Sequence, residues 1–211
     1  MMQSSRHDRG LVGHAGGWLA VVCLLASSFA LAHATSTASQ GLPQLDRVML
    51  VDPPRAIADF ELTDQNGAPY NSTRLRGQPV LIFFGYAHCP DVCPAALAKL
   101  KLVHESQDEA VRRAQVVFVS VDGERDTSAA LKEYLARLSP DFIGLTGDPD
   151  VVRGIAEGFH VAFYKDQPGA DASYEVEHSG QLYLIDAAGN LRAELYDPPV
   201  AAIEAVLRAL D

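Results

Sequence analysis

Two cysteines define the most chemically informative stretch of the chain, Gly85-Tyr-Ala-His-Cys-Pro-Asp-Val-Cys-Pro94. Cys89 and Cys93 stand four residues apart, and each is followed by proline. Thiolates are the nucleophiles of disulfide exchange and also the ligands that soft metals prefer. The pair therefore predicts either a redox-active disulfide or a metal site. A purely structural disulfide, or two inert buried thiols, is the competing interpretation.

The flanking residues place these cysteines where a central strand ends and a helix begins. Before them, Pro79–Tyr86 is a continuous apolar run, typical of a strand buried on both faces. After them, Ala95–His104 has helix formers with apolar residues at helical spacing, and the helix is expected to reach about Arg113. A residue before proline avoids helical dihedrals, so Cys93 is predicted as the N-cap with Pro94 at the first helical position. The free N–H groups of a helix start would favour the thiolate form.

The other elements alternate between strands and helices. Asn66-Gly67 indicates an N-terminal hairpin, and the Pro/Gly/Asp-rich stretch Lys165–Ala172 indicates the loose tip of a second one. The order βαβ, αβ, ββα with cysteines at the first helix predicts an α/β, thioredoxin-like fold with an N-terminal hairpin extension and an insertion near residues 160–175. The predicted strands are Asp59–Thr63, Gln115–Val121, Phe142–Thr146, Val161–Tyr164, Tyr174–Glu177, Gln181–Asp186 and Leu191–Tyr196, and the predicted helices are Ser128–Leu138, Asp148–Phe159 and Val200–Leu210.

His178 is the histidine best placed to join the cysteines. It lies in Tyr174-Glu-Val-Glu-His-Ser179, just before the predicted strand Gln181–Asp186. In thioredoxin-type folds the loop before that strand packs beside the cysteine loop, and redox enzymes of this fold place a cis-proline there. An imidazole facing two thiolates would make a three-ligand soft site. A hydrogen-bonded loop histidine is the alternative, and His88, adjacent to Cys89, is a less favoured ligand.

The N-terminal residues have the pattern of a secretory signal peptide. Arg6 and Arg9 give a charged start, Trp18–Ala32 is apolar, and Ala32-His-Ala34 matches a small-x-small cleavage site. An uncleaved inner-membrane anchor is the alternative, although the apolar run is shorter than the roughly 20 residues of a membrane span.

The sequence thus predicts a signal peptide (1–34), a flexible tether (35–54) and one folded domain (55–211). The chain of 211 residues has 27 acidic and 17 basic residues, net charge −10, which disfavours a nucleic-acid partner. Export would place the domain in the periplasm. In that oxidising compartment two lone cysteines four apart favour a disulfide or a metal.

Three motifs in order resemble the Sco/SenC family: Gly85–Pro94, Ser120-Val-Asp-Gly-Glu-Arg-Asp-Thr127 and Tyr174–Ser179. The resemblance spans roughly residues 55–211. It implies a thioredoxin-like domain that binds copper through two cysteines and a histidine and helps to assemble the dinuclear copper site of cytochrome c oxidase. By position these ligands are Cys89, Cys93 and His178, for one copper ion as Cu(I) or Cu(II). The implied partners are the copper-binding subunit of the oxidase and other copper chaperones or thiol-disulfide proteins.

Two functions remain open for the same cysteines. The first is a copper chaperone, which is not an enzyme, that delivers copper to the oxidase or prepares its copper site. The second is a thiol-disulfide oxidoreductase that acts on cysteines of a partner protein. His178 and the missing cis-proline favour the metal. A peroxidase is disfavoured because no Thr/Arg pair accompanies Cys89.

Overall fold

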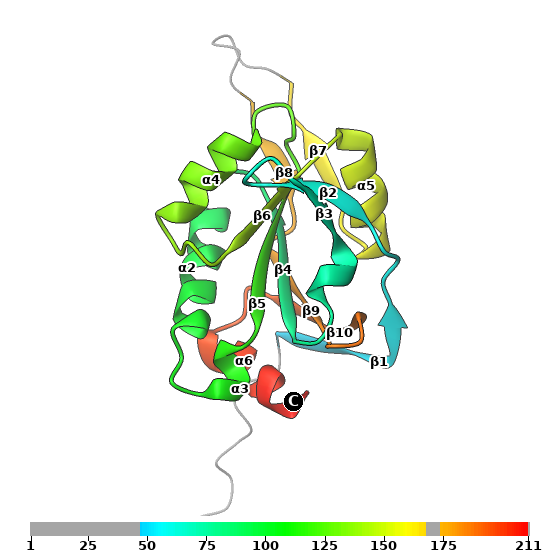
Figure 1. Ribbon diagram of the computed structural model, residues 1–211, viewed down its shortest axis with the longest axis vertical. Coiled ribbons are helices and arrows are strands. Elements are labelled where there is room, and N and C mark those ends of the chain that lie inside the picture. The colour runs from blue at the N-terminus through cyan, green and yellow to red at the C-terminus, as the bar shows by residue number, and fades with distance from the viewer. Residues whose placement is uncertain (1–46, 168–173, 211) are drawn as a thin grey trace, which may run out of the picture. The chain divides into compact units, whose positions relative to one another are not determined.

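An eight-stranded mixed sheet is built around β4 (Val80–Gly85), the apolar strand that precedes the cysteines (Figure 1). The computed structural model describes residues 47–167 and 174–210. The strands are β1 (Val48–Ala56), β2 (Glu61–Asp64), β3 (Pro69–Asn71), β4 (Val80–Gly85), β5 (Gln115–Ser120), β6 (Ile143–Thr146), β7 (Phe163–Lys165), β8 (Val176–His178), β9 (Gln181–Ile185) and β10 (Asn190–Tyr196). Strand order in the sheet is β1-β10-β9-β4-β5-β6-β2-β3, and β7 and β8 form a separate two-stranded hairpin. The helices are η1 (Ser72–Leu75), α2 (Val92–His104), α3 (Glu109–Arg112), α4 (Ser128–Ala136), α5 (Pro149–Gly158) and α6 (Val200–Ala209).

The strand directions bring the motifs to one edge of the sheet. β4, β5 and β6 are parallel, so their carboxyl ends lie together. β9 runs antiparallel to β4, with Phe83 opposite Leu182, so the start of β9 lies at that same edge. The cysteines follow β4 and His178 precedes β9, so the topology alone brings their backbones close. This confirms the predicted thioredoxin-like α/β arrangement.

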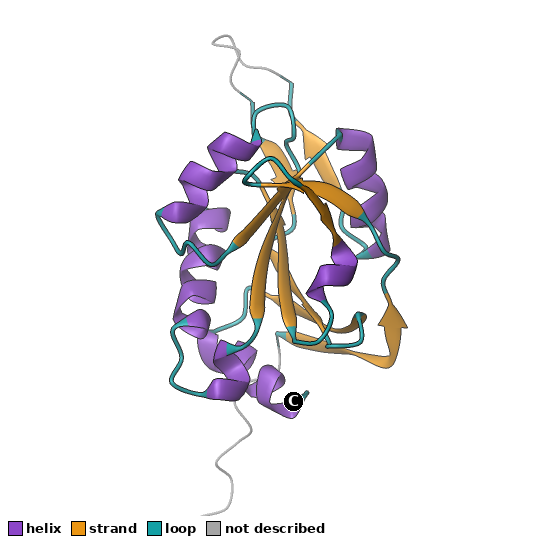
Figure 2. Cartoon of the chain, viewed as in Figure 1, coloured by secondary structure: helices purple, strands orange, loops and turns teal. Residues whose placement is uncertain are grey.

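Helices cover both faces of the sheet, and aromatic side chains fill the two layers. In Figure 1, α2 and α4 lie to the left of the sheet and α5 to the right, and Figure 2 shows the strands fanned between them. Because neighbouring strand residues point to opposite faces, Phe83 packs against Phe118 while Phe84 packs against Phe159 and Tyr183. Every residue of β4 is buried, as its unbroken apolar run predicts.

The start of α2 differs from the prediction. The helix begins at Val92 with Asp91 as N-cap, so Cys93 is the second helical residue and Pro94 the third. Proline is tolerated there because the first four N–H groups of a helix have no acceptor within it. The prediction that Cys93 is the N-cap is therefore wrong by two residues.

The end of α2 also differs. The helix stops at His104, not near Arg113, and a second short helix, α3, follows. The side chain of Asp108 accepts a hydrogen bond from Ala110 N at 3.1 Å, which starts the new helix. A capping residue inside an otherwise helical pattern thus divides it in two.

The tether predicted for residues 35–54 is wrong at its C-terminal end. β1 begins at Val48 and pairs with β10, with a shift in register between Leu50 and Arg55. Pro53 and Pro54 lie in that irregular stretch, where their missing N–H groups leave no ladder bond unmade. In the sequence these prolines indicate a segment without regular structure, but in the fold an edge strand accommodates them. The remaining tether residues and the predicted signal peptide lie outside the described residues.

Both predicted hairpins are present. β2 and β3 are joined through Gly67, whose φ of +82° suits glycine, and this pair extends the sheet beyond β6. β7 and β8 form the insertion hairpin, whose tip at 168–173 is outside the described residues. Within 47–167 and 174–210, no helix is long and apolar enough to cross a membrane.

Candidate metal centre

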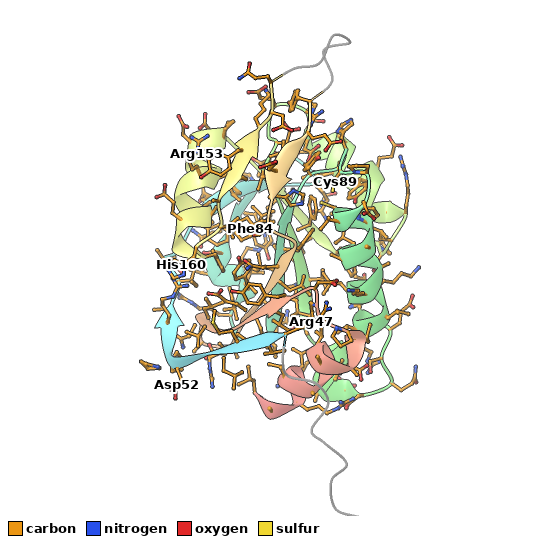
Figure 3. All side chains as sticks on the ribbon, turned by 180° about the vertical axis from the view of Figure 1, so that it is seen from behind. Arg47, Asp52, Phe84, Cys89, Arg153 and His160 are labelled. Carbon is orange, nitrogen blue, oxygen red and sulfur yellow. The ribbon has the colours of Figure 1, made fainter. Side chains whose placement is uncertain are left out.

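Cys89, Cys93 and His178 come together at the carboxyl edge of β4. Their candidate ligand atoms all lie within 4.8 Å of one another, although the histidine is 85 residues beyond the second cysteine. Cys89 lies in the loop between β4 and α2, Cys93 in the first turn of α2, and His178 at the end of β8. Figure 3 labels Cys89 beside the start of the green helix α2. The three residues selected from the sequence are thus brought together by the fold.

Both cysteines are free thiols and both are buried. Cys93 N donates to Cys89 Sγ at 3.3 Å, so the sulfur takes the place of a capping side chain at the helix start. Burial raises the pKa of the Cys93 thiol far above its ordinary value, and the neighbouring Cys89 adds to this. Burial of the sulfur therefore opposes the preference for thiolate that is expected at a helix start, because the charged form loses its hydration there.

The ring of His178 is oriented by two hydrogen bonds. Nδ1 lies 2.9 Å from Val176 O, and because a carbonyl only accepts, Nδ1 carries the proton. Nε2 then presents its lone pair 3.2 Å from Cys93 Sγ. Burial lowers the pKa of His178, while the bond to Val176 opposes this. The imidazole is thus held neutral with the nitrogen that would bind a metal facing the thiols.

Aromatic rings enclose the histidine. The Tyr86 ring centroid lies 5.3 Å and the Phe83 centroid 6.3 Å from that of His178, both edge-to-face. Tyr86 and Phe83 are almost completely buried, so neither ring can turn away into solvent. This packing limits the positions open to the imidazole.

The donor set fits a soft metal ion. Bonds of about 2.0–2.3 Å, as found for zinc, place the ligands of a three- or four-coordinate ion roughly 3.3–4.0 Å apart. Ligand atoms within 4.8 Å of one another therefore need only a small closing movement to share an ion. Two sulfurs and one imidazole suit Cu(I) and accommodate Cu(II), whereas closed structural zinc sites have four ligands. Three protein ligands leave a position open to an incoming group.

One buried carboxyl group beneath the cysteine loop is not predicted from the sequence. Asp126 Oδ2 accepts hydrogen bonds from Ala87 N at 2.9 Å and from Ser120 Oγ at 2.7 Å. Burial raises its pKa, although these hydrogen bonds oppose the shift. Its position in a polar loop after β5 indicates a place at the sheet edge, but nothing in the sequence indicates that this side chain is buried.

The other described histidines lie outside the cluster. The side chain of His88 is 57% exposed, and its Nδ1 is 3.6 Å from Asp126 Oδ1. His104 Nε2 lies 3.2 Å from Asp141 Oδ2, and His160 Nδ1 lies 3.9 Å from Glu194 Oε1. His88 is therefore adjacent to Cys89 in sequence without joining it in the site.

Comparison with known proteins identifies the family. A family model described as SCO1/SenC matches residues 50–210. An SCO2-like protein of Rickettsia felis is 42% identical over 140 residues, which cover 65% of this chain and 68% of that protein. The structure of Bradyrhizobium japonicum ScoI with copper bound has 35% sequence identity and a TM-score of 0.67, and the match covers 74% of this chain and 99% of that one.

A more distant structure supports the fold. BsSco, described as a member of the Sco family of cytochrome c oxidase assembly proteins, has a TM-score of 0.61 at 20% identity, covering 77% of this chain and 96% of that chain. The family model spans most of this chain, including both cysteines and the histidine. The chain therefore belongs to the SCO1/SenC family.

Proposed function

We propose that this protein binds one copper ion through Cys89, Cys93 and His178 and acts as a copper chaperone. The observation that carries the proposal is the gathering of two thiols and an oriented imidazole nitrogen within 4.8 Å of one another. The copper-bound structure of the Bradyrhizobium relative supports copper as the ion. Thiolates hold Cu(I), and the imidazole adds the harder donor that Cu(II) requires.

The copper is cargo, and its destination is cytochrome c oxidase. The association of the Sco family with assembly of that enzyme supports this role. The chaperone would deliver copper to the dinuclear site of the copper-binding oxidase subunit, or prepare that site, and would exchange copper or electrons with other copper chaperones or thiol-disulfide proteins. Three ligands leave an open position where a thiolate of the partner can bind before the ion departs. Delivery would take place in the periplasm, after export directed by the N-terminal residues.

Copper titration of the reduced protein tests the ligand set. The wild type is expected to bind about one ion, with thiolate-to-copper charge transfer for Cu(II). Cys89→Ala and Cys93→Ala should abolish this binding, whereas His178→Ala should keep some Cu(I) binding and lose most stable Cu(II) binding. His160→Asn is the matched control, because that exposed imidazole lies beside Glu194, outside the cluster, and asparagine tolerates its φ of +58°. Undiminished binding in either cysteine variant would overturn the assignment.

A second candidate, thiol-disulfide oxidoreductase, is favoured by one observation: both cysteines are free and their sulfurs lie within 4.8 Å. A reductase needs the two thiols but tolerates loss of the imidazole. Oxidase assembly in cells carrying His178→Ala separates the two functions. Assembly at the wild-type level, with Cys89→Ala defective in the same assay, would support the reductase and oppose copper delivery.

A further inference from the structure

Residues 122–126, in the loop between β5 and α4, contact both the segment that carries the two cysteines and the segment that carries His178. We call these residues the bridging loop. Its last residue, Asp126, holds the cysteine side, because its carboxylate accepts from Ala87 N two residues before Cys89. The same carboxylate accepts from Ser120 Oγ at the end of β5, so the cysteine loop is tied to the central sheet. Asp126 is fully buried, which keeps water from competing for these bonds.

The preceding residue, Arg125, holds the histidine side. Its Nη1 donates to Tyr174 O at 3.0 Å, and its guanidinium carbon lies 3.6 Å from the centroid of the Tyr174 ring. Its Nε pairs with the Asp122 carboxylate, whose other oxygen accepts from the Tyr174 hydroxyl at 2.9 Å. The guanidinium therefore contacts Tyr174 through the backbone, the ring face and a shared carboxylate. Planar geometry and several fixed donors suit arginine to this role in a way that lysine cannot reproduce.

The β7–β8 hairpin, which carries His178, needs contacts such as that between Arg125 and Tyr174 to keep its position. β8 has three residues and pairs with β7, apart from the eight-stranded sheet. A two-stranded hairpin is marginally stable on its own. Val176 packs into the core, and Tyr174, two residues earlier, provides the polar connection to the bridging loop. His178 takes its ring orientation from Val176 O, so the position of β8 determines where Nε2 points.

We propose that Arg125 is a positioning residue for the metal centre: it fixes the β7–β8 hairpin so that His178 Nε2 faces the two thiols. This inference rests on the proposed ligand role of His178. Adjacent residues of one loop would then set the two halves of the site relative to each other, Asp126 for the cysteines and Arg125 for the histidine. A second cation, Lys165, also lies 4.0 Å from the Tyr174 ring centroid, but it is more exposed and pairs with Glu124 at the surface.

The test is a double-mutant cycle of Arg125→Ala with His178→Ala, measured by Cu(II) and Cu(I) titration of the full reduced protein. Arg125→Ala should weaken Cu(II) binding by about tenfold or more, the usual effect of removing a group that orients a ligand. It should also shift the charge-transfer spectrum toward that of His178→Ala. The affinity for Cu(I) should stay within about threefold of the wild-type value, a smaller change than the tenfold loss expected for Cu(II). In the His178→Ala background, Arg125→Ala should have no further effect. Arg125→Lys should restore only part of the loss.

A metal-free measurement accompanies the cycle. Hydrogen exchange of the apo protein should quicken at the β8 amides in Arg125→Ala while β4 and β5 keep their protection. Arg153→Ala is the matched control, because Arg153 lies 5.8 Å from the ring of Phe163 in β7 and is exposed (Figure 3). It should change neither copper binding nor exchange.

The outcomes separate the two proposals. Wild-type Cu(II) binding in Arg125→Ala, with His178→Ala defective, overturns the positioning role and leaves the ligand assignment intact. Equal losses of Cu(II) and Cu(I) binding with faster exchange throughout the sheet also overturn it, because they indicate general destabilisation. Wild-type Cu(II) binding in His178→Ala overturns the proposed ligand set itself. Loss of Cu(II) binding in Arg125→Ala that vanishes in the His178→Ala background supports the positioning role.

Discussion

Replacing Gly85 by alanine should have two effects: it should destabilise the fold, and it should displace the sulfur of Cys93. Gly85 ends β4, and a Cβ added there would lie 2.7 Å from Cys93 Sγ, 2.9 Å from Phe83 Cε1 and 3.0 Å from Phe118 Cε2. All three neighbours are fully buried, so none can swing into solvent. Forcing a methyl group into a packed core costs about 1–3 kcal/mol. At roughly 2–4 °C per kcal/mol for a domain of this size, Tm should fall by about 2–12 °C.

The effect on the metal centre follows from which atom is closest. The sulfur of Cys93 is the nearest atom to the added methyl group, and it moves by rotation about a single bond. We therefore expect Gly85→Ala to change the Cu(II) charge-transfer spectrum and weaken copper binding. Thermal unfolding of the reduced apo protein and copper titration measure the two effects separately.

The matched control is Gly154→Ala. Gly154 lies inside α5, and a Cβ there would meet nothing within 4 Å. Alanine in a helix interior is favoured over glycine by about 0.5–1 kcal/mol, so this variant should be slightly more stable and bind copper normally. If Gly85→Ala melts and binds copper as the wild type does, the conclusion that this glycine makes room for the sulfur is refuted.

Three further outcomes are expected. Oxidation should give an intramolecular Cys89–Cys93 disulfide, and bound copper should protect both thiols from alkylation; mass spectrometry showing only intermolecular bridges would contradict this. Asp126→Asn should gain stability relative to wild type as pH rises above the ordinary carboxyl value of 3.8, because burial raises the pKa of Asp126 and ionising it in the fold is unfavourable. Denaturant titrations at several pH values check the sign, and a difference that shrinks with pH would contradict it. Copper at 100 times its Kd should stabilise the protein by up to about 2.7 kcal/mol, reversibly on adding a chelator, and an unchanged Tm would argue against binding to the native state.

Much of the fold can be predicted because its signals are local. The apolar run of β4, the helical spacing after it and the Asn66-Gly67 turn each report backbone structure through nearby residues. The errors occur where a local signal is ambiguous. Proline at Pro94 is compatible with more than one position in a first helical turn, and Pro53 is compatible with either a tether or an irregular edge strand.

The residue types and their order already predict which chemistry is available: two thiols four residues apart, a histidine before a strand, and an order of elements that brings them to one sheet edge. Tertiary packing produces the 3.2 Å contact between Cys93 Sγ and His178 Nε2, which joins residues far apart in the chain. It also decides that Cys93 and Asp126 are buried, and hence the direction of both pKa shifts. Burial and long-range contact depend on how all the elements pack, so no local pattern encodes them. For the same reason, the sequence does not indicate the proposed positioning role of Arg125, which depends on its long-range contact with Tyr174.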